Sequence, residues 1–131
     1  MRRIHLYAAV AALAAGLVSA AKAEGLHAVG PLAGYACMNL KLTDKELQDK
    51  SLAVPVYDGP SKESSRVGNA AAVVIAKSPL HVVNGFAELL FPTGREVWIE
   101  ADLLTAYHSE SDPNAHCTPS LMSNGKPGFG P

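Results

Sequence analysis

The sequence predicts an all-β domain. From Ser51 onward, short runs of β-branched and apolar residues alternate with clusters of turn residues, a pattern typical of strands joined by tight turns. Asn84-Gly85 stands between two such runs, and Asn-Gly in that setting is the strongest short signal for a β-hairpin. Two further turn signals, Asp58-Gly59-Pro60-Ser61 and Pro92-Thr93-Gly94-Arg95, lie on either side of it along the chain. We therefore expect a small β domain whose successive strands are joined by these turns.

The first 23 residues have the pattern of a secretory signal peptide. A basic start, Met1-Arg2-Arg3, precedes an apolar run over residues 6–21 and the small-x-small sequence Ala21-Lys22-Ala23. The apolar run is shorter than the roughly 20 residues that a membrane-spanning helix needs. We expect cleavage after Ala23, with Ala20 as the alternative, and a periplasmic or secreted protein with no membrane span after processing.

The charge balance of the processed chain disfavours nucleic acid as a partner. Loss of residues 1–23 leaves 108 of the 131 residues, with 8 basic side chains against 12 acidic ones and a formal charge of −4. A mildly acidic chain without a basic patch does not follow a phosphate backbone. The remaining length suits one domain with one modest core.

Both cysteines lie in the part of the chain that is predicted to be exported. Cys37 stands near the start of this part and Cys117 near its end. Two cysteines in an oxidising compartment most often form one disulfide. The alternative is a redox-active or metal-binding thiol pair, but the sequence has no Cys-x-x-Cys and no second cluster to complete a site. We expect a structural disulfide, and neither a metal ion nor another cofactor.

The elements before Ser51 form an N-terminal lead, residues 24–50. Residues 35–42 suit a short strand that carries Cys37. Residues 43–50 are almost wholly polar, and Thr43 followed by Glu46 has the spacing of a capping box, which predicts a single helical turn. The sequence leaves open whether the lead adds a strand to the β domain or only wraps it.

The β domain is expected over residues 51–107. One short helical turn over residues 101–104 should close it. After it, residues 108–131 are rich in Ser, Pro, Asn and Gly, so we expect a flexible tail that is held only at Cys117. The strands are expected over residues 52–57, 67–76, 80–83, 86–91 and 96–100.

Two stretches of this domain resemble the bacterial SH3-like family. VYDGPSKESSRVG, Val56 to Gly68, is similar to the family's opening strand and turn, and NGFAELLFPTGREVWIEADLL, Asn84 to Leu104, is similar to its closing strands and final turn. The resemblance spans residues 52–104, and Phe86 stands where the family commonly has Trp. It implies a small SH3-like β-barrel of about five strands, and a role in binding at the bacterial cell envelope.

The last two expected strands, residues 86–91 and 96–100, form a closing hairpin. Strand alternation divides its side chains between a core face and an outer face. The outer face carries Phe86 and Trp98 among acidic residues, and Tyr57 at the first turn completes an aromatic patch that is a candidate binding site. The alternative is that a strongly bent barrel buries both faces and that these aromatic residues simply pack. The residues expected in the core are Ala87, Leu89, Phe91, Val97 and Ile99; the acidic residues expected on the outer face are Glu88, Glu96 and Glu100.

The sequence contains no recognisable catalytic site. There is no Gly-x-Ser-x-Gly motif, and the histidines are not spaced as metal ligands. We expect an exported, non-catalytic binding module that contacts a peptide, peptidoglycan or a partner protein of the envelope. The alternatives are a structural or inhibitory accessory protein that acts by protein–protein contact, for instance through the tail, and a small hydrolase.

Overall fold

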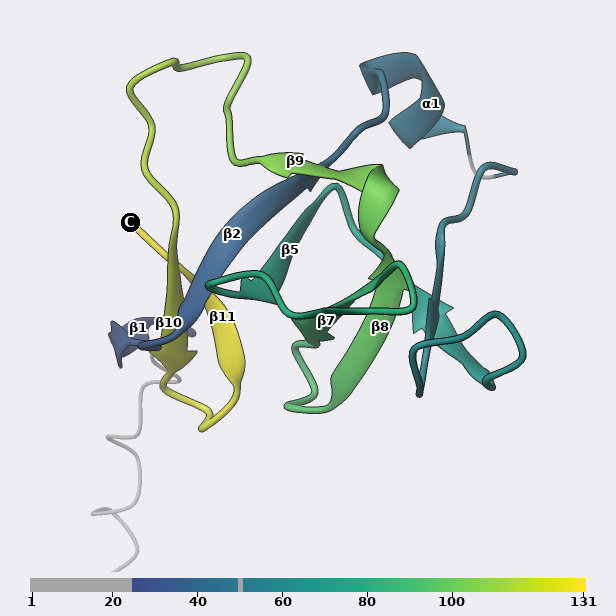
Figure 1. The fold of residues 1–131 in the computed structure, drawn as a ribbon. Coiled ribbons are helices and arrows are strands. Elements are labelled where there is room, and N and C mark those ends of the chain that lie inside the picture. Colours follow the sequence, from purple (N-terminus) through teal and green to yellow (C-terminus); the bar gives the residue numbers. More distant parts are fainter. Residues whose placement is uncertain (1–24, 50) are drawn as a thin grey trace, which may run out of the picture.

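A computed structural model describes residues 25–49 and 51–131 (Figure 1). The predicted signal peptide, residues 1–23, lies outside the described residues. The prediction of an all-β fold is confirmed, because the only helical elements among the described residues are α1 (Asp44–Gln48) and the 3₁₀ turn η2 (Ala101–Leu103). The strands are β1 (Ala28–Pro31), β2 (Tyr35–Leu40), β3 (Pro55–Tyr57), β4 (Arg66–Asn69), β5 (Val73–Lys77), β6 (Val82–Val83), β7 (Phe86–Leu90), β8 (Glu96–Glu100), β9 (Leu104–Ala106), β10 (Thr118–Met122) and β11 (Pro127–Gly130).

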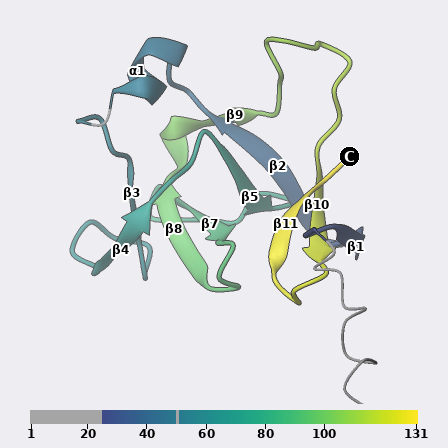
Figure 2. The same cartoon turned by 180° about the vertical axis from the view of Figure 1, so that it is seen from behind.

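The strands form two antiparallel sheets. The larger sheet has eight strands in the order β4-β3-β8-β7-β5-β2-β9, with β6 also paired to β7. The smaller sheet has the order β1-β10-β11 and lies beside β2, on the opposite side of the molecule from the β3–β4 hairpin (Figures 1 and 2). The expectation of a closed barrel of about five strands was wrong for the described residues. They hold eleven strands, and the large sheet ends at the unjoined edges β4 and β9.

The predicted alternation of β7 and β8 is confirmed. The residues that point into the core are Ala87, Leu89, Val97 and Ile99, each at most 1% exposed, and Phe91 packs against this cluster from its edge. Full burial of a Leu or Ile side chain contributes roughly 1.5–3 kcal/mol to folding. Because these alternate residues of β7 and β8 point into the core, the residues between them lie on the outer face of the hairpin.

The tight turns hold the strands in register. Asn84 and Gly85 both have positive φ, 52° and 80°, as a two-residue hairpin loop with a right-handed twist requires. This turn joins β6 to β7, as the Asn-Gly signal predicts. The strand expected over residues 67–76 is instead divided into β4 and β5 at residues 70–72, where Ala70 N–H bonds to Val54 and Ala72 C=O to Leu40 N–H.

The lead segment contributes a strand to the large sheet. β2 lies between β5 and β9, with Cys37 opposite Ile75 and Leu40 opposite Leu104. The predicted capping box is confirmed: Thr43 Oγ1 accepts a hydrogen bond from the Glu46 N–H. β2 shows that the described part of the lead, residues 25–49, adds a strand to the large sheet.

The expected flexible tail carries β10 and β11 instead. These strands pair with each other and with β1, and the predicted Cys37–Cys117 disulfide is confirmed, with a Cα–Cα distance of 6.1 Å. A Cβ at Gly128 would collide with the side chain of Met122, and one at Gly130 with Ser120. At Gly128 and Gly130 the absence of a side chain thus permits close packing inside the small sheet.

Candidate functional site

Tyr57, Phe86 and Trp98 lie together on the outer face of the large sheet, and we call this group the aromatic face. Tyr57 on β3 stands opposite Trp98 on β8, and Phe86 on β7 stands opposite Glu100 on β8. The rings of Tyr57 and Phe86 meet edge to face with centroids 5.8 Å apart, an arrangement that aromatic pairs favour. Because β8 runs between β3 and β7, the contact between Tyr57 and Phe86 passes over β8. It divides the aromatic face into one end at Trp98 and another end at Glu100.

The three aromatic rings differ in exposure. Phe86 is 6% exposed. For its ring, therefore, the alternative interpretation holds, in which the aromatic residues are packed inside the protein. Tyr57 and Trp98 are both half-buried. A half-buried Tyr or Trp has an apolar surface and a polar atom available to a partner.

One end of the aromatic face holds a buried carboxylate. Glu88 stands opposite Trp98 and is 6% exposed, although it was expected to be a solvated acidic residue. Lys77 and His81 cover it: Lys77 Nζ lies 2.8 Å and His81 Nδ1 3.8 Å from Glu88 Oε2. The His81 ring also lies 5.5 Å from that of Trp98. The hydrogen bond to Glu88 and its negative charge raise the pKa of the Lys77 ammonium.

The other end of the aromatic face holds an exposed ion pair. Lys62 Nζ lies 3.1 Å from Glu100 Oε1, and the two side chains are 69% and 41% exposed. Glu100 raises the pKa of the Lys62 ammonium through a hydrogen bond and its charge, and Tyr57 adds to the effect. Lys62 belongs to the loop between β3 and β4, whose base is closed by Asp58 N–H donating to Ser65 C=O over 3.0 Å.

A hollow of about 320 Å³ adjoins this second end. It lies between the β3–β4 loop and the Asn84-Gly85 turn. Its lining residues are Pro60, Ser61, Lys62, Glu63, Asn84 and Phe86. The aromatic face therefore continues into a recess that has both charged and polar groups at its edge.

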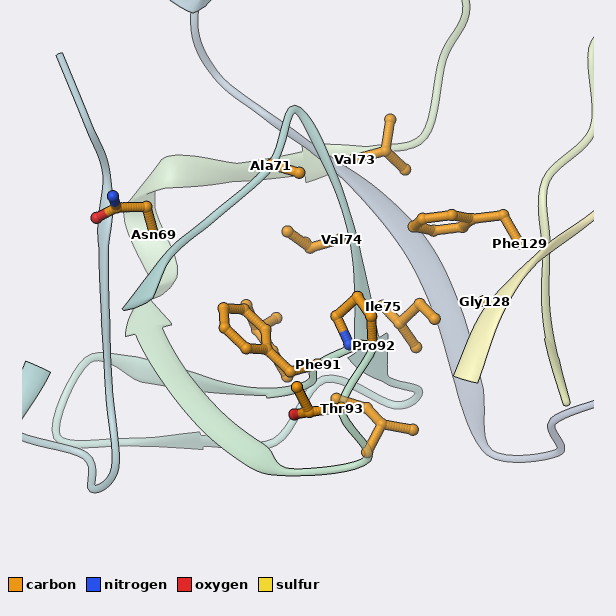
Figure 3. Close-up of a pocket in the computed structure, with 12 residues that line it drawn as sticks. Asn69, Ala71, Val73, Val74, Ile75, Phe91, Pro92, Thr93, Gly128 and Phe129 are labelled. Atoms are coloured by element: carbon orange, nitrogen blue, oxygen red, sulfur yellow. The ribbon is translucent and has the colours of Figure 1, made fainter. Parts of the chain in front are cut away.

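A second hollow, of about 350 Å³, lies away from the aromatic face. Phe91 and Phe129 stand on opposite sides of it, and Val73 and Ile75 of β5 lie between them (Figure 3). None of its lining side chains is charged. The sequence did not suggest this hollow, because Phe129 belongs to the segment that was expected to be a flexible tail.

No protein-family model, curated protein or solved structure matches this chain. The function is therefore inferred from the residues of the chain itself.

Neither a cluster of metal-binding side chains nor a membrane-spanning helix is seen in residues 25–49 and 51–131. No three His, Cys, Asp or Glu side chains gather there as a metal site would require. Within the same ranges, no helix is both long enough and apolar enough to cross a bilayer. Besides the aromatic face with its hollow and the apolar hollow beside Phe129, two further hollows of about 310 and 280 Å³ lie near α1, and both are lined in part by Leu40 and Leu42.

Proposed function

We propose that this chain is an exported, non-catalytic SH3-like module that binds a peptide, a peptidoglycan fragment or a partner protein of the bacterial envelope on its aromatic face. The observation that carries the proposal is the half-burial of Tyr57 and Trp98 on the outer face of a paired sheet, next to an open hollow. Rigid amphipathic rings on a fixed backbone bind extended chains at a low cost in conformational entropy.

The strand order supports an SH3-like origin. β9, β2, β5, β7 and β8 are neighbours in that order, and η2 lies between β8 and β9. A unit of about five neighbouring strands with a short helical turn is what the resemblance to the SH3-like family implies. On this proposal, the β3–β4 hairpin and the small sheet are additions to that unit, and the unit begins at β2 rather than at Ser51.

The disulfide supports export. Cys37 and Cys117 are joined across 80 residues of the chain, and such bonds persist in oxidising compartments. A signal peptide cleaved after Ala23 would deliver the protein to the periplasm or the medium. The proposal therefore places the aromatic face in contact with envelope components.

An envelope pull-down tests the proposed function. The bait is the oxidised, processed protein, next to a Trp98→Ala variant whose fold is checked by circular dichroism and a Tyr57→Ala variant as a second probe. We expect the wild type to retain a peptidoglycan fragment or an envelope protein that both variants lose. Equal capture by the wild type and both variants would contradict binding at the aromatic face.

The apolar hollow supports a second candidate, an accessory protein that acts through its C-terminal strands. Leu121 and Phe129 are 40% and 44% exposed on the small sheet. A Phe129→Ala variant in the same pull-down is both the control for the aromatic face and the test of this candidate. Loss of capture with Phe129→Ala alone would favour the C-terminal strands as the contact surface.

A further inference from the structure

We propose that the aromatic face selects a peptide with a basic side chain, and that Lys62 occupies the position of that side chain until a ligand displaces it. The inference rests on the proposed function and deepens it, because it names the chemistry of the ligand. It is carried by the arrangement of two carboxylates and two lysines around the aromatic rings.

Each end of the aromatic face has a carboxylate that already holds an ammonium group. Glu88 forms an ion pair with Lys77 at one end, with 2.8 Å between Oε2 and Nζ, and Glu100 forms one with Lys62 at the other, with 3.1 Å between Oε1 and Nζ. The Tyr57 and Phe86 rings, which meet edge to face, lie between these ends. The face is therefore built to hold positive charge beside aromatic surface.

The two ion pairs differ in how readily they can be exchanged. Lys77 lies at the end of β5, and its partner Glu88 is only 7% exposed, so separating them would leave a charge buried. Lys62 lies on a loop, and both it and Glu100 are well exposed. An exposed pair of this kind adds little to stability, so a ligand can replace Lys62 at Glu100 at a small cost.

The surroundings of Glu100 match a Lys or Arg side chain of a ligand. Phe86 stands opposite Glu100, and its ring meets that of Tyr57 edge to face; an ammonium or guanidinium group beside an aromatic ring gains cation–π attraction. The adjoining hollow, which Glu63 and Phe86 help to line, leaves room for the stem of a longer side chain. The formal charge of −4 on residues 24–131 also attracts basic ligands.

A displayed library of random decapeptides is the probe for this inference. The processed, oxidised protein is the bait, and the best enriched peptide is synthesised for affinity measurements. We expect the enriched peptides to share one Lys or Arg position. Against the synthetic peptide, Glu100→Gln should bind roughly fivefold more weakly, and Lys62→Ala roughly two- to fivefold more tightly because the internal competitor is gone.

The controls separate this inference from the proposed function. Lys41→Ala removes another exposed lysine, one that lies outside the aromatic face, and should leave the affinity unchanged. Enriched peptides without a shared basic position, or weaker binding by Lys62→Ala, would overturn the inference and leave the proposed function standing. A library from which the wild type enriches nothing would overturn the inference, whereas the proposed function would still be tested by the envelope pull-down, in which a peptidoglycan fragment or a partner protein can be captured.

Discussion

Glu88 is an acidic residue that is buried on the outer face of the large sheet. Its effect on the free energy of unfolding depends on Lys77. The Glu88 side chain is 7% exposed, and the Lys77 side chain beside it is 40% exposed. Loss of the carboxylate frees a lysine that water can solvate, whereas loss of the lysine leaves a charge in a site with little water. The two members of the pair should therefore respond differently to substitution.

We expect Lys77→Met to lower the free energy of unfolding by more than Glu88→Gln does. Glu88→Gln keeps the shape of the side chain and removes the ion pair, so it should cost about 1 kcal/mol. Lys77→Met keeps the buried carboxylate and removes its main partner. Equilibrium unfolding in urea at pH 7 measures both, and an equal or larger loss for Glu88→Gln would contradict the argument.

The stabilisation that the folded state gains from the contact between Glu110 and Asp44 should depend on pH. A hydrogen bond with Asp44 and its negative charge raise the pKa of the Glu110 carboxyl. Because this pKa is higher in the folded than in the unfolded chain, the contact stabilises the folded state fully below the unfolded pKa of about 4.3. The stabilisation is lost as pH rises through the folded pKa.

A titration of the carboxyl signals by NMR checks this prediction. We expect the pKa of Glu110 to lie above that of an ordinary glutamate and to fall towards it in an Asp44→Asn variant. Asp112→Asn, in the same loop, serves as the control and should leave the titration of Glu110 unchanged. A titration of Glu110 that is the same with and without the Asp44 carboxylate would contradict it.

At the scale of single residues, the sequence predicted the core better than the outer face. Alternation along β7 and β8 identified Leu89 and Ile99 as core residues, because the pleat of a strand fixes that pattern. The burial of Glu88 was missed because His81 and Lys77 cover it from a neighbouring part of the sheet. No local pattern in the sequence predicts that side chains from another segment will shield a carboxylate from solvent.

The turn between β6 and β7 depends on a backbone conformation that favours glycine. Gly85 has a φ of 80° and no atom within 4 Å of where a Cβ would stand, so the cost of a side chain there is conformational rather than steric. We expect Gly85→Ala to lower the free energy of unfolding by about 1–2 kcal/mol. Gly30→Ala, at a site that is equally open but lacks a positive φ, should change it by much less in the same thermal or chemical unfolding experiment.

Elements with local signals were predicted, and elements that depend on distant partners were not. β8 and the β6–β7 turn follow from residues within their own segments. β10 and β11 were missed because Pro119, Pro127 and the glycines near them weaken a strand pattern. Pro119 and Pro127 have no N–H to donate, yet both lie in strands, since the small sheet draws its order from pairing with β1 and from the disulfide.

At the scale of the whole molecule, the described residues form two sheets, which one disulfide cross-links. The main core lies within the large sheet, whereas Cys37 and Met122 are buried outside that core, on β2 and β10. β10 contacts β2, and Cys117 leads into β10 from the disulfide. The small sheet is thus held against the large one through the bond and a limited packed area.

Removal of the disulfide should weaken the small sheet first. The bond closes a loop of 80 residues, and its loss through a paired Cys37→Ala, Cys117→Ala substitution should lower the free energy of unfolding by roughly 2–4 kcal/mol. Because β1, β10 and β11 have little other attachment to the large sheet, their amide hydrogens should lose protection from exchange before those of β7 and β8. Hydrogen exchange with mass spectrometry on the oxidised protein and the variant measures this order. Uniform loss of protection in both sheets would instead mean that the small sheet is an integral part of one cooperative core, and that truncation of the C-terminal strands would unfold the aromatic face as well.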